Sequence, residues 1–168
     1  METDVIRVGL DKLGKELIKE FANELVTQGH KLTGSLINSL RQDILFAPSS
    51  FTLAFYGNHY GLYLETGRRK GAKKIPIDVL MKFVALRGMA STQKEARNIA
   101  FAIQMAIYKQ GSPTKGAYKY TRNGKRINWI SGTVADNKSK IQKTIQKLFK
   151  NQMETTLRNI AKDFNQKV

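Results

Sequence analysis

Apolar residues recur at three- and four-residue steps near both ends of the chain, and this periodicity is the strongest constraint on its fold. Near the N-terminus the repeat has charged residues on its opposite side and consists of Leu10, Leu13, Leu17, Phe21 and Leu25. Between residues 136 and 166 lysines take the exposed side of a second repeat, which consists of Ile141, Ile145, Leu148, Phe149, Met153, Leu157, Ile160 and Phe164. Such spacing is typical of amphipathic helices. We therefore expect a first helix that ends at Gly29 and a last helix that packs in its own chain or between subunits.

The segment between residues 33 and 57 predicts a short helix followed by two strands. Thr33 is placed to cap a helical turn that carries Leu36, Ile37 and Leu40. Residues 43–47 and 51–57 then form two apolar and branched runs on either side of Pro48-Ser49-Ser50. Two such runs around a tight connection predict an antiparallel β-hairpin.

Two more helices are predicted between residues 76 and 111. Pro76 suits the first turn of a helix, where its missing N–H costs nothing, and Gly88 is expected to end that helix. Thr92 and Glu95 have the spacing of a capping box at the start of the next helix. That helix is apolar on much of its circumference, so we expect it to pack on the sheet or against a neighbouring subunit.

Residues 117–130 read as a basic, aromatic β-hairpin. Asn123-Gly124 lies between two runs rich in aromatic and branched residues, the strongest short-range hairpin signal. In this interpretation aromatic rings alternate with cations, namely Tyr118, Lys119, Tyr120, Arg122, Lys125, Arg126 and Trp129. Such a surface suits nucleic-acid binding through stacking and phosphate contacts. Ordinary strand packing, with aromatic rings on the core and cations in solvent, is the alternative.

Length and composition favour a soluble α+β domain. A chain of 168 residues without cysteine can bury about two-thirds of its unfolded surface, needs no disulfides and suits a reducing cytoplasm. No apolar stretch approaches the roughly 20 residues of a membrane span, and the N-terminus lacks a signal-peptide pattern. We expect a single domain over residues 1–168, with a small, mostly antiparallel sheet packed by helices.

Positive charge is concentrated in the second part of the chain. Residues 1–66 carry 6 basic and 8 acidic side chains, whereas residues 67–168 carry 23 basic and 5 acidic ones, and the net charge of the chain is +16. One concentration is a glycine-flanked segment that we expect to be a mobile loop, with Arg68, Arg69, Lys70, Lys73 and Lys74. Such fields attract polyanions, although a basic run is also typical of an ordinary solvated surface.

The sequence does not predict an enzyme. His30 and His59 have no carboxylate or histidine at metal-ligand spacing, so we propose no metal site and no cofactor. Glu65 is the only acidic residue between Asp43 and Asp78, which leaves no catalytic carboxylate pair. Ser35 and Ser39 lack triad partners, and helix caps or contacts with the backbone explain them more simply.

Four short strings resemble the head–tail joining or tail-completion (neck) proteins of tailed bacteriophages. They are LTGSLINSL from Leu32, YGLYLETG from Tyr60, Ile75-Pro76, and IAFAIQMAIYKQGSPTKG from Ile99. Their order and spacing cover about half the chain. The residues that carry the signature are Thr33, Gly34, Ser39, Tyr60, Glu65, Gly67 and Pro76. Residues 1–116 form the part similar to this family, and residues 117–168 are interpreted as an addition.

The resemblance implies a structural virion protein. Proteins of this kind form a homo-oligomeric ring in the neck or upper tail, contact adjoining neck and tail proteins, and let double-stranded genomic DNA pass through the channel. The chain would be assembled in the host cytoplasm and reside in the virion. The basic loop and the predicted hairpin would contact DNA or an acidic partner ring. A basic nucleic-acid-binding module acting as a monomer or dimer is the alternative.

Glu65 has two interpretations. The resemblance places it, with Gly67, in the family signature at the edge of the sheet, where it would make a subunit or fold contact. A salt bridge to Arg68 or Arg69 is the other interpretation. Neither makes Glu65 catalytic.

Overall fold

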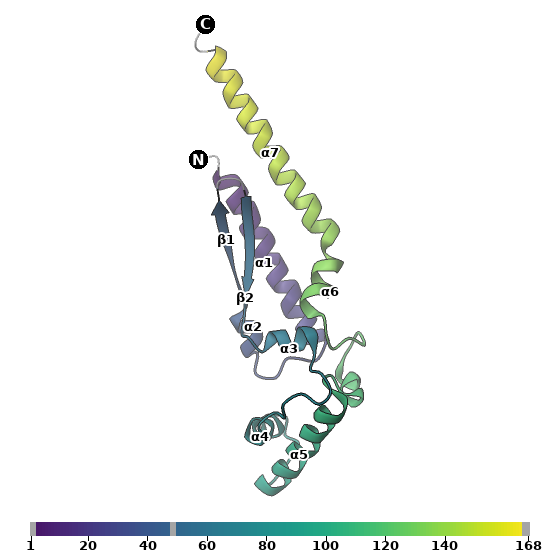
Figure 1. Cartoon of the computed structure of the whole chain (residues 1–168). Helices are drawn as coiled ribbons and strands as arrows, with labels where there is room; N and C mark the ends of the chain where they lie inside the picture. The colour runs from purple at the N-terminus through teal and green to yellow at the C-terminus, as the bar shows by residue number, and fades with distance from the viewer. Residues whose placement is uncertain (1–2, 48–49, 166–168) are drawn as a thin grey trace.

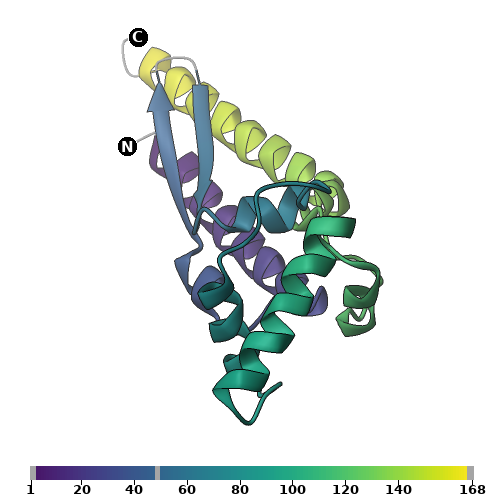
Figure 2. The same cartoon turned by 60° about the horizontal axis from the view of Figure 1, so that its bottom comes forward.

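The computed structural model describes residues 3–47 and 50–165 and has the predicted α+β architecture, with one small sheet and long helices at both ends of the chain. Helix α1 (Thr3–Thr27) lies beside the sheet and beside α6 (Trp129–Asp136) and α7 (Lys138–Asn165) (Figure 1). Helices α4 (Ile77–Leu86) and α5 (Gln93–Gln110) lie together at the opposite end of the molecule from the C-terminus (Figures 1 and 2).

Helix α1 forms as predicted because its apolar stripe is buried along its length. Leu13, Leu17, Phe21 and Leu25 belong to the main hydrophobic cluster, which Leu36 and Trp129 complete. The Phe21 ring meets the Trp129 ring edge to face, with centroids 5.8 Å apart. The helix ends before Gly29, whose φ of 71° suits a left-handed helix end.

The sheet is the predicted hairpin, formed by β1 (Arg41–Ala47) and β2 (Ser50–Tyr56) in antiparallel register, with Ile44 opposite Leu53. Pro48 and Ser49 of the predicted connection lie outside the described residues. The sheet approaches α1 closely at Gly14, where the Gln42 side chain occupies the space that a Cβ would fill. The Gln42 amide donates hydrogen bonds of 2.9 Å to the carbonyl and to the carboxylate of Asp11.

Two short helices flank the sheet in the sequence. Helix α2 (Ser35–Ser39) precedes β1, and the Thr33 hydroxyl accepts a hydrogen bond of 3.3 Å from the Ser35 N–H. Helix α3 (Gly61–Thr66) follows β2 and packs against α6.

Helices α4 and α5 pack on each other around a second hydrophobic cluster of Leu80, Val84, Ala96 and Ala100. The start of α5 was predicted correctly, since the Thr92 hydroxyl accepts from the Glu95 N–H at 3.2 Å and the Glu95 carboxylate accepts from the Ser91 N–H at 2.9 Å. The prediction that α5 packs on the sheet was wrong. Helix α4 covers its apolar face instead, because the apolar stripes of these two neighbouring helices bury each other locally.

We call residues 68–111 the arm. It joins the rest of the molecule where Arg68 and Ser112 exchange two backbone hydrogen bonds, of 2.8 and 3.0 Å. Gly67 and Gly111 flank this bridge with φ of 73° and 82°. A Cβ on Gly67 would collide with the Ser112 carbonyl, and one on Gly111 with the Arg68 carbonyl.

The predicted hairpin over residues 117–130 was wrong. The structure has a 3-10 helix, η1 (Lys115–Tyr120), then an irregular segment, and α6 from Trp129 onward. Asn123 and Gly124 form a local turn in which the Asn123 side-chain oxygen accepts from the Lys125 N–H at 3.1 Å.

This segment forms hydrogen bonds with the C-terminal end of α1 instead of pairing as two strands, because the last carbonyls of a helix lack donors within the helix. The Arg122 N–H donates to the Thr27 carbonyl at 2.9 Å, and the Arg126 guanidinium to the Gln28 carbonyl at 2.6 Å. The amide of the fully buried Gln28 donates to the Ile127 carbonyl at 3.1 Å.

The predicted C-terminal helix corresponds to α7, with α6 as an additional helix before it and a break at Asn137. Its first half packs in its own chain. Ile141 and Ile145 lie against the main cluster, and Leu148 contacts Gly9 of α1. The second half continues beyond the N-terminal end of α1 (Figure 1).

Candidate functional site

Half of the net positive charge lies on the arm. The arm makes up about a quarter of the chain. It carries 10 basic and 2 acidic residues, so its net charge is +8, whereas that of the whole chain is +16. Since the arm joins the rest of the molecule mainly at the bridge between Arg68 and Ser112, most of these cations face solvent. A projecting unit with such a field attracts polyanions.

The basic loop of the arm is attached to α5 and to α3. The Gly71 N–H donates to the Tyr108 carbonyl at 2.8 Å, and the Lys74 ammonium lies 5.2 Å from the centre of the Tyr108 ring. The Arg68 guanidinium donates to the Lys73 carbonyl at 2.5 Å and lies 5.6 Å from the Tyr63 ring centre. Arg68 and Lys74 therefore have structural partners within the chain.

Arg69, Lys70 and Lys73 are exposed, as is Lys74, but unlike Lys74 their side chains do not lie over an aromatic ring of the described chain. Within the part of the chain that the structure describes, no ion pair holds their side chains. These three residues are the ones best placed to meet a phosphate or a carboxylate from outside.

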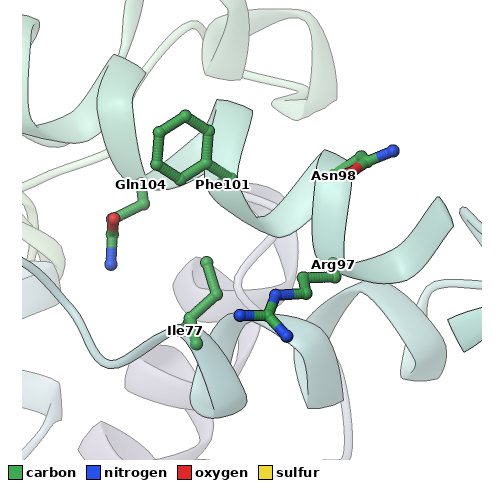
Figure 3. A pocket seen from close by; sticks show the side chains of 5 residues that line it. All are labelled: Ile77, Arg97, Asn98, Phe101 and Gln104. Carbon is green, nitrogen blue, oxygen red and sulfur yellow. The ribbon is translucent and has the colours of Figure 1, made fainter. Parts of the chain in front are cut away.

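A shallow hollow of about 540 Å³ lies on the same arm, between α4 and α5. Figure 3 shows the residues that line it, Ile77, Arg97, Asn98, Phe101 and Gln104. The Gln104 amide donates to the Ile75 carbonyl at 2.6 Å, whereas the Phe101 ring is largely exposed. Sequence reasoning missed Arg97 and Asn98. The sequence signal for them is spacing: Arg97 and Asn98 precede Phe101 by four and three residues, which places all three side chains on one side of a helix.

Segment 117–129 does not present the surface that we predicted. Lys119 and Arg122 are exposed, and the Lys119 ammonium lies 5.0 Å from the Tyr120 ring centre. The Lys125 ammonium is 3.9 Å from the Asp136 carboxylate. Arg126 is half-buried at the end of α1, and burial, with the nearby charge of Arg87, lowers the pKa of its guanidinium.

Trp129 is not available for stacking, so its assignment as a DNA or partner contact was wrong. Its side chain is only 4% exposed in the main hydrophobic cluster, and its indole N–H donates to the Gly61 carbonyl at 2.9 Å. The hairpin on which the prediction depended does not exist here, because Trp129 begins a helix.

Glu65 makes a fold contact between two helices. Its carboxylate accepts from the Ile130 N–H at 2.6 Å, from the Ser131 N–H at 3.1 Å and from the Ser131 hydroxyl at 2.5 Å. No ion pair joins it to Arg68 or Arg69 among the described residues. The salt-bridge interpretation and the placement at the sheet edge were both wrong, because residues 61–66 form a helix that faces α6.

The other residues that carry the resemblance occupy caps and turns. Gly34 precedes α2 with φ of 79°, Tyr60 precedes α3, Gly67 ends it, and Pro76 precedes α4. The Ser39 hydroxyl donates to the Leu36 carbonyl at 2.7 Å and accepts from the Asn58 N–H at 2.9 Å. Ser39 thus makes the predicted contacts with the backbone.

His30 belongs to the junction at the end of α1. Its Nε2 lies 3.1 Å from the Arg126 carbonyl, so the ring donates there. Burial, followed by the charge of Arg126, lowers the pKa of His30 to about 4. His59 is exposed beside Tyr63, with ring centres 5.8 Å apart. No three His, Asp or Glu side chains of residues 3–47 and 50–165 gather as metal ligands would.

Comparison with known proteins finds no match to a family model, to a curated protein or to a solved structure. Within the described ranges, no helix has both the length and the apolar character that crossing a membrane requires.

Proposed function

We propose that the chain is a structural virion protein of a tailed bacteriophage, which forms a homo-oligomeric ring in the neck or upper tail. Such a ring joins head to tail and lets genomic DNA pass. The proposal rests on the second half of α7. One face of this half is apolar, and no other part of the described chain packs on it. Met153, Leu157 and Phe164 are 65%, 63% and 70% exposed there. A face of this kind is typical of a subunit that completes its packing in an assembly.

The resemblance in four strings supplies the identity of that assembly. It is independent of the exposed helix, since the strings lie between residues 32 and 116. Together they favour a protein that acts through subunit contacts, with adjoining neck and tail proteins as its partners.

The arm has a defined role in this proposal. Its charge of +8 would face the DNA in the channel or an acidic surface of an adjoining ring. Arg69, Lys70 and Lys73 would make that contact, with Lys119 and Arg122 on the segment after α5 as additional cations.

Light scattering on the nucleic-acid-free protein, at low and at high salt, tests the proposal. A ring-sized multiple of the 19.0 kDa chain that persists at high salt is the expected result, because apolar packing is not screened. A chain that stays monomeric at both salt concentrations, and at high protein concentration, would overturn it.

The arm also favours a second candidate, a nucleic-acid-binding module that acts as a monomer or dimer. On the arm, Lys74 lies 5.2 Å from the Tyr108 ring centre, and Arg97 and Phe101 line the same hollow. Just after the arm, Lys119 lies 5.0 Å from the Tyr120 ring centre. This candidate predicts binding to free DNA or RNA that weakens steeply with salt. A monomeric mass together with such binding would support it over the ring.

A further inference from the structure

We infer that the projecting end of α7 docks into an apolar pocket at the base of the hairpin of a second copy of the chain. The inference rests on the proposed ring, because it names the contact that would link neighbouring subunits. We call residues 151–165 the overhang.

The overhang presents a narrow apolar seam. Met153, Leu157, Ile160 and Phe164 follow one another at steps of four, three and four residues, which is the spacing of a coiled-coil seam. Even the least exposed of them, Ile160, is 47% exposed. The overhang continues α7 beyond the N-terminal end of α1 (Figure 1).

The pocket lies between α1, α2, the base of the hairpin, α3 and α6, and has a volume of about 320 Å³. Phe21, Leu36 and Trp129 are its buried lining residues, and Phe55, Tyr56 and Leu62 are exposed ones. Its volume is at the lower end of the range of ligand pockets, about 300–1,000 Å³. One or two large apolar side chains suit such a space.

The overhang cannot reach this pocket in its own chain. Helix α7 is held along α1 by the contact of Leu148 with Gly9 and by an ion pair of 2.9 Å between Lys140 and Glu16. The helix therefore points away from the pocket, which lies beside the C-terminal half of α1, at Ile18 and Phe21. A second molecule has to supply whatever fills the pocket.

Charge favours a second copy as the occupant. Residues 138–150 of α7 carry five lysines and no acidic residue, whereas the overhang carries Glu154, Arg158, Lys162 and Asp163 and is neutral. If the overhang bound an acidic partner, we would expect the lysines of residues 138–150 to extend into it. A neutral overhang instead approaches another copy of a +16 chain without added repulsion, and its two acidic residues suit the Arg41 guanidinium in the pocket lining.

The two surfaces differ, so the contact is heterologous, and heterologous contacts generate rings when the rotation closes. Area leads to the same conclusion. Four side chains cover less than the roughly 800 Å² per partner of a stable interface. Each copy therefore needs two such contacts, one through its overhang and one through its pocket, as in a closed ring.

Cysteine cross-linking tests the contact directly, since the chain has no cysteine of its own. Ala161→Cys lies at the edge of the seam, and His59→Cys lies in the pocket lining. A mixture of the two variants should form a disulfide-linked dimer under mild oxidation. The matched control mixes Ala161→Cys with Val79→Cys, an exposed position on α4, and should not.

The outcomes separate this inference from the ring itself. Cross-linking no greater than in the control, or linkage of Ala161→Cys chains mainly to each other, overturns the docking. If the wild-type protein is nevertheless ring-sized by light scattering, the proposed function survives. Cross-linking of a protein that remains monomeric would establish the contact and count against the ring.

A mixing experiment gives a second measurement. Leu157→Glu should disable the overhang and Leu62→Glu the pocket, both at exposed positions. Each variant alone should stay monomeric at all protein concentrations. The mixture should form a weak dimer whose population rises with protein concentration, since a single contact remains between unlike chains. A Leu62→Glu variant that assembles like wild type contradicts the inference.

Discussion

The carboxylate of Glu65 accepts a hydrogen bond of 2.6 Å from the backbone N–H of Ile130, across 65 positions of sequence. Helix α6 needs this acceptor because it has no cap of its own. Asn128, the residue before the helix, has φ of 60° and makes no side-chain cap. Glu65 therefore provides the N-terminal cap of α6 from α3, and its charge suits the positive end of the helix dipole.

Replacing Glu65 by alanine should destabilise the fold by about 2 kcal/mol, since it removes a cap and leaves two N–H groups unpaired. Glu65→Gln should cost less, because one acceptor oxygen remains. Urea unfolding measures both. The control is Asp136→Asn on the same helix, where an exposed pair with Lys125 should contribute less than about 0.5 kcal/mol. An equal effect of Glu65→Ala and Asp136→Asn would contradict the cap.

Replacing Gly67, beside the bridge between Arg68 and Ser112, should destabilise the fold more than replacing glycines elsewhere in the chain. Gly67→Ala combines a positive φ, which costs about 1–2 kcal/mol, with a collision against the Ser112 carbonyl. Gly71→Ala has a similar φ of 75° but open space, so it should show the first cost alone. Gly116→Ala has neither and should be close to neutral. The order of thermal midpoints checks this, and a Gly67→Ala variant as stable as Gly71→Ala would rule it out.

Acidification should weaken the fold through His30. The pKa of His30 is lowered to about 4 by burial, while an unfolded histidine titrates near 6.5. Between these values the unfolded chain binds more protons than the folded one, so the free energy of unfolding falls as pH drops from about 6.5 to about 4. His30→Gln keeps an N–H donor and should flatten this part of the profile. A His30→Gln profile as steep as that of the wild type between these pH values would contradict this prediction.

Much of the fold was predictable because its signals are local. The stripe of α1, the Thr92 and Glu95 cap and the strands on either side of Pro48 each depend on neighbours within a few residues. The same applies to Ser39, whose contacts with the backbone were expected.

The failures concern residues whose partners are distant in sequence. Asn123-Gly124 is a strong hairpin signal, but the carbonyls of Thr27 and Gln28 at the end of α1 compete for this segment from 95 and 98 positions away. Trp129 and Glu65 were misinterpreted for the same reason, since Gly61 and Ile130 lie 68 and 65 positions from them. Periodicity also could not show that only the first half of the α7 stripe is covered.

Polyanion binding should depend on the arm more than on total charge. We expect Arg69→Gln, Lys70→Gln and Lys73→Gln together to weaken DNA binding and to reduce the slope of log K against log salt by about 0.9 for each phosphate that the loop no longer neutralises. The matched control neutralises the exposed Lys138, Lys143 and Lys147 on α7, which changes the net charge by the same amount. Fluorescence anisotropy with a short duplex at several salt concentrations measures both slopes. The slope should become clearly shallower in the arm variant and change little in the control variant. Equal slopes in the two variants would mean that binding follows the overall field of the +16 chain and that the basic loop has no special role.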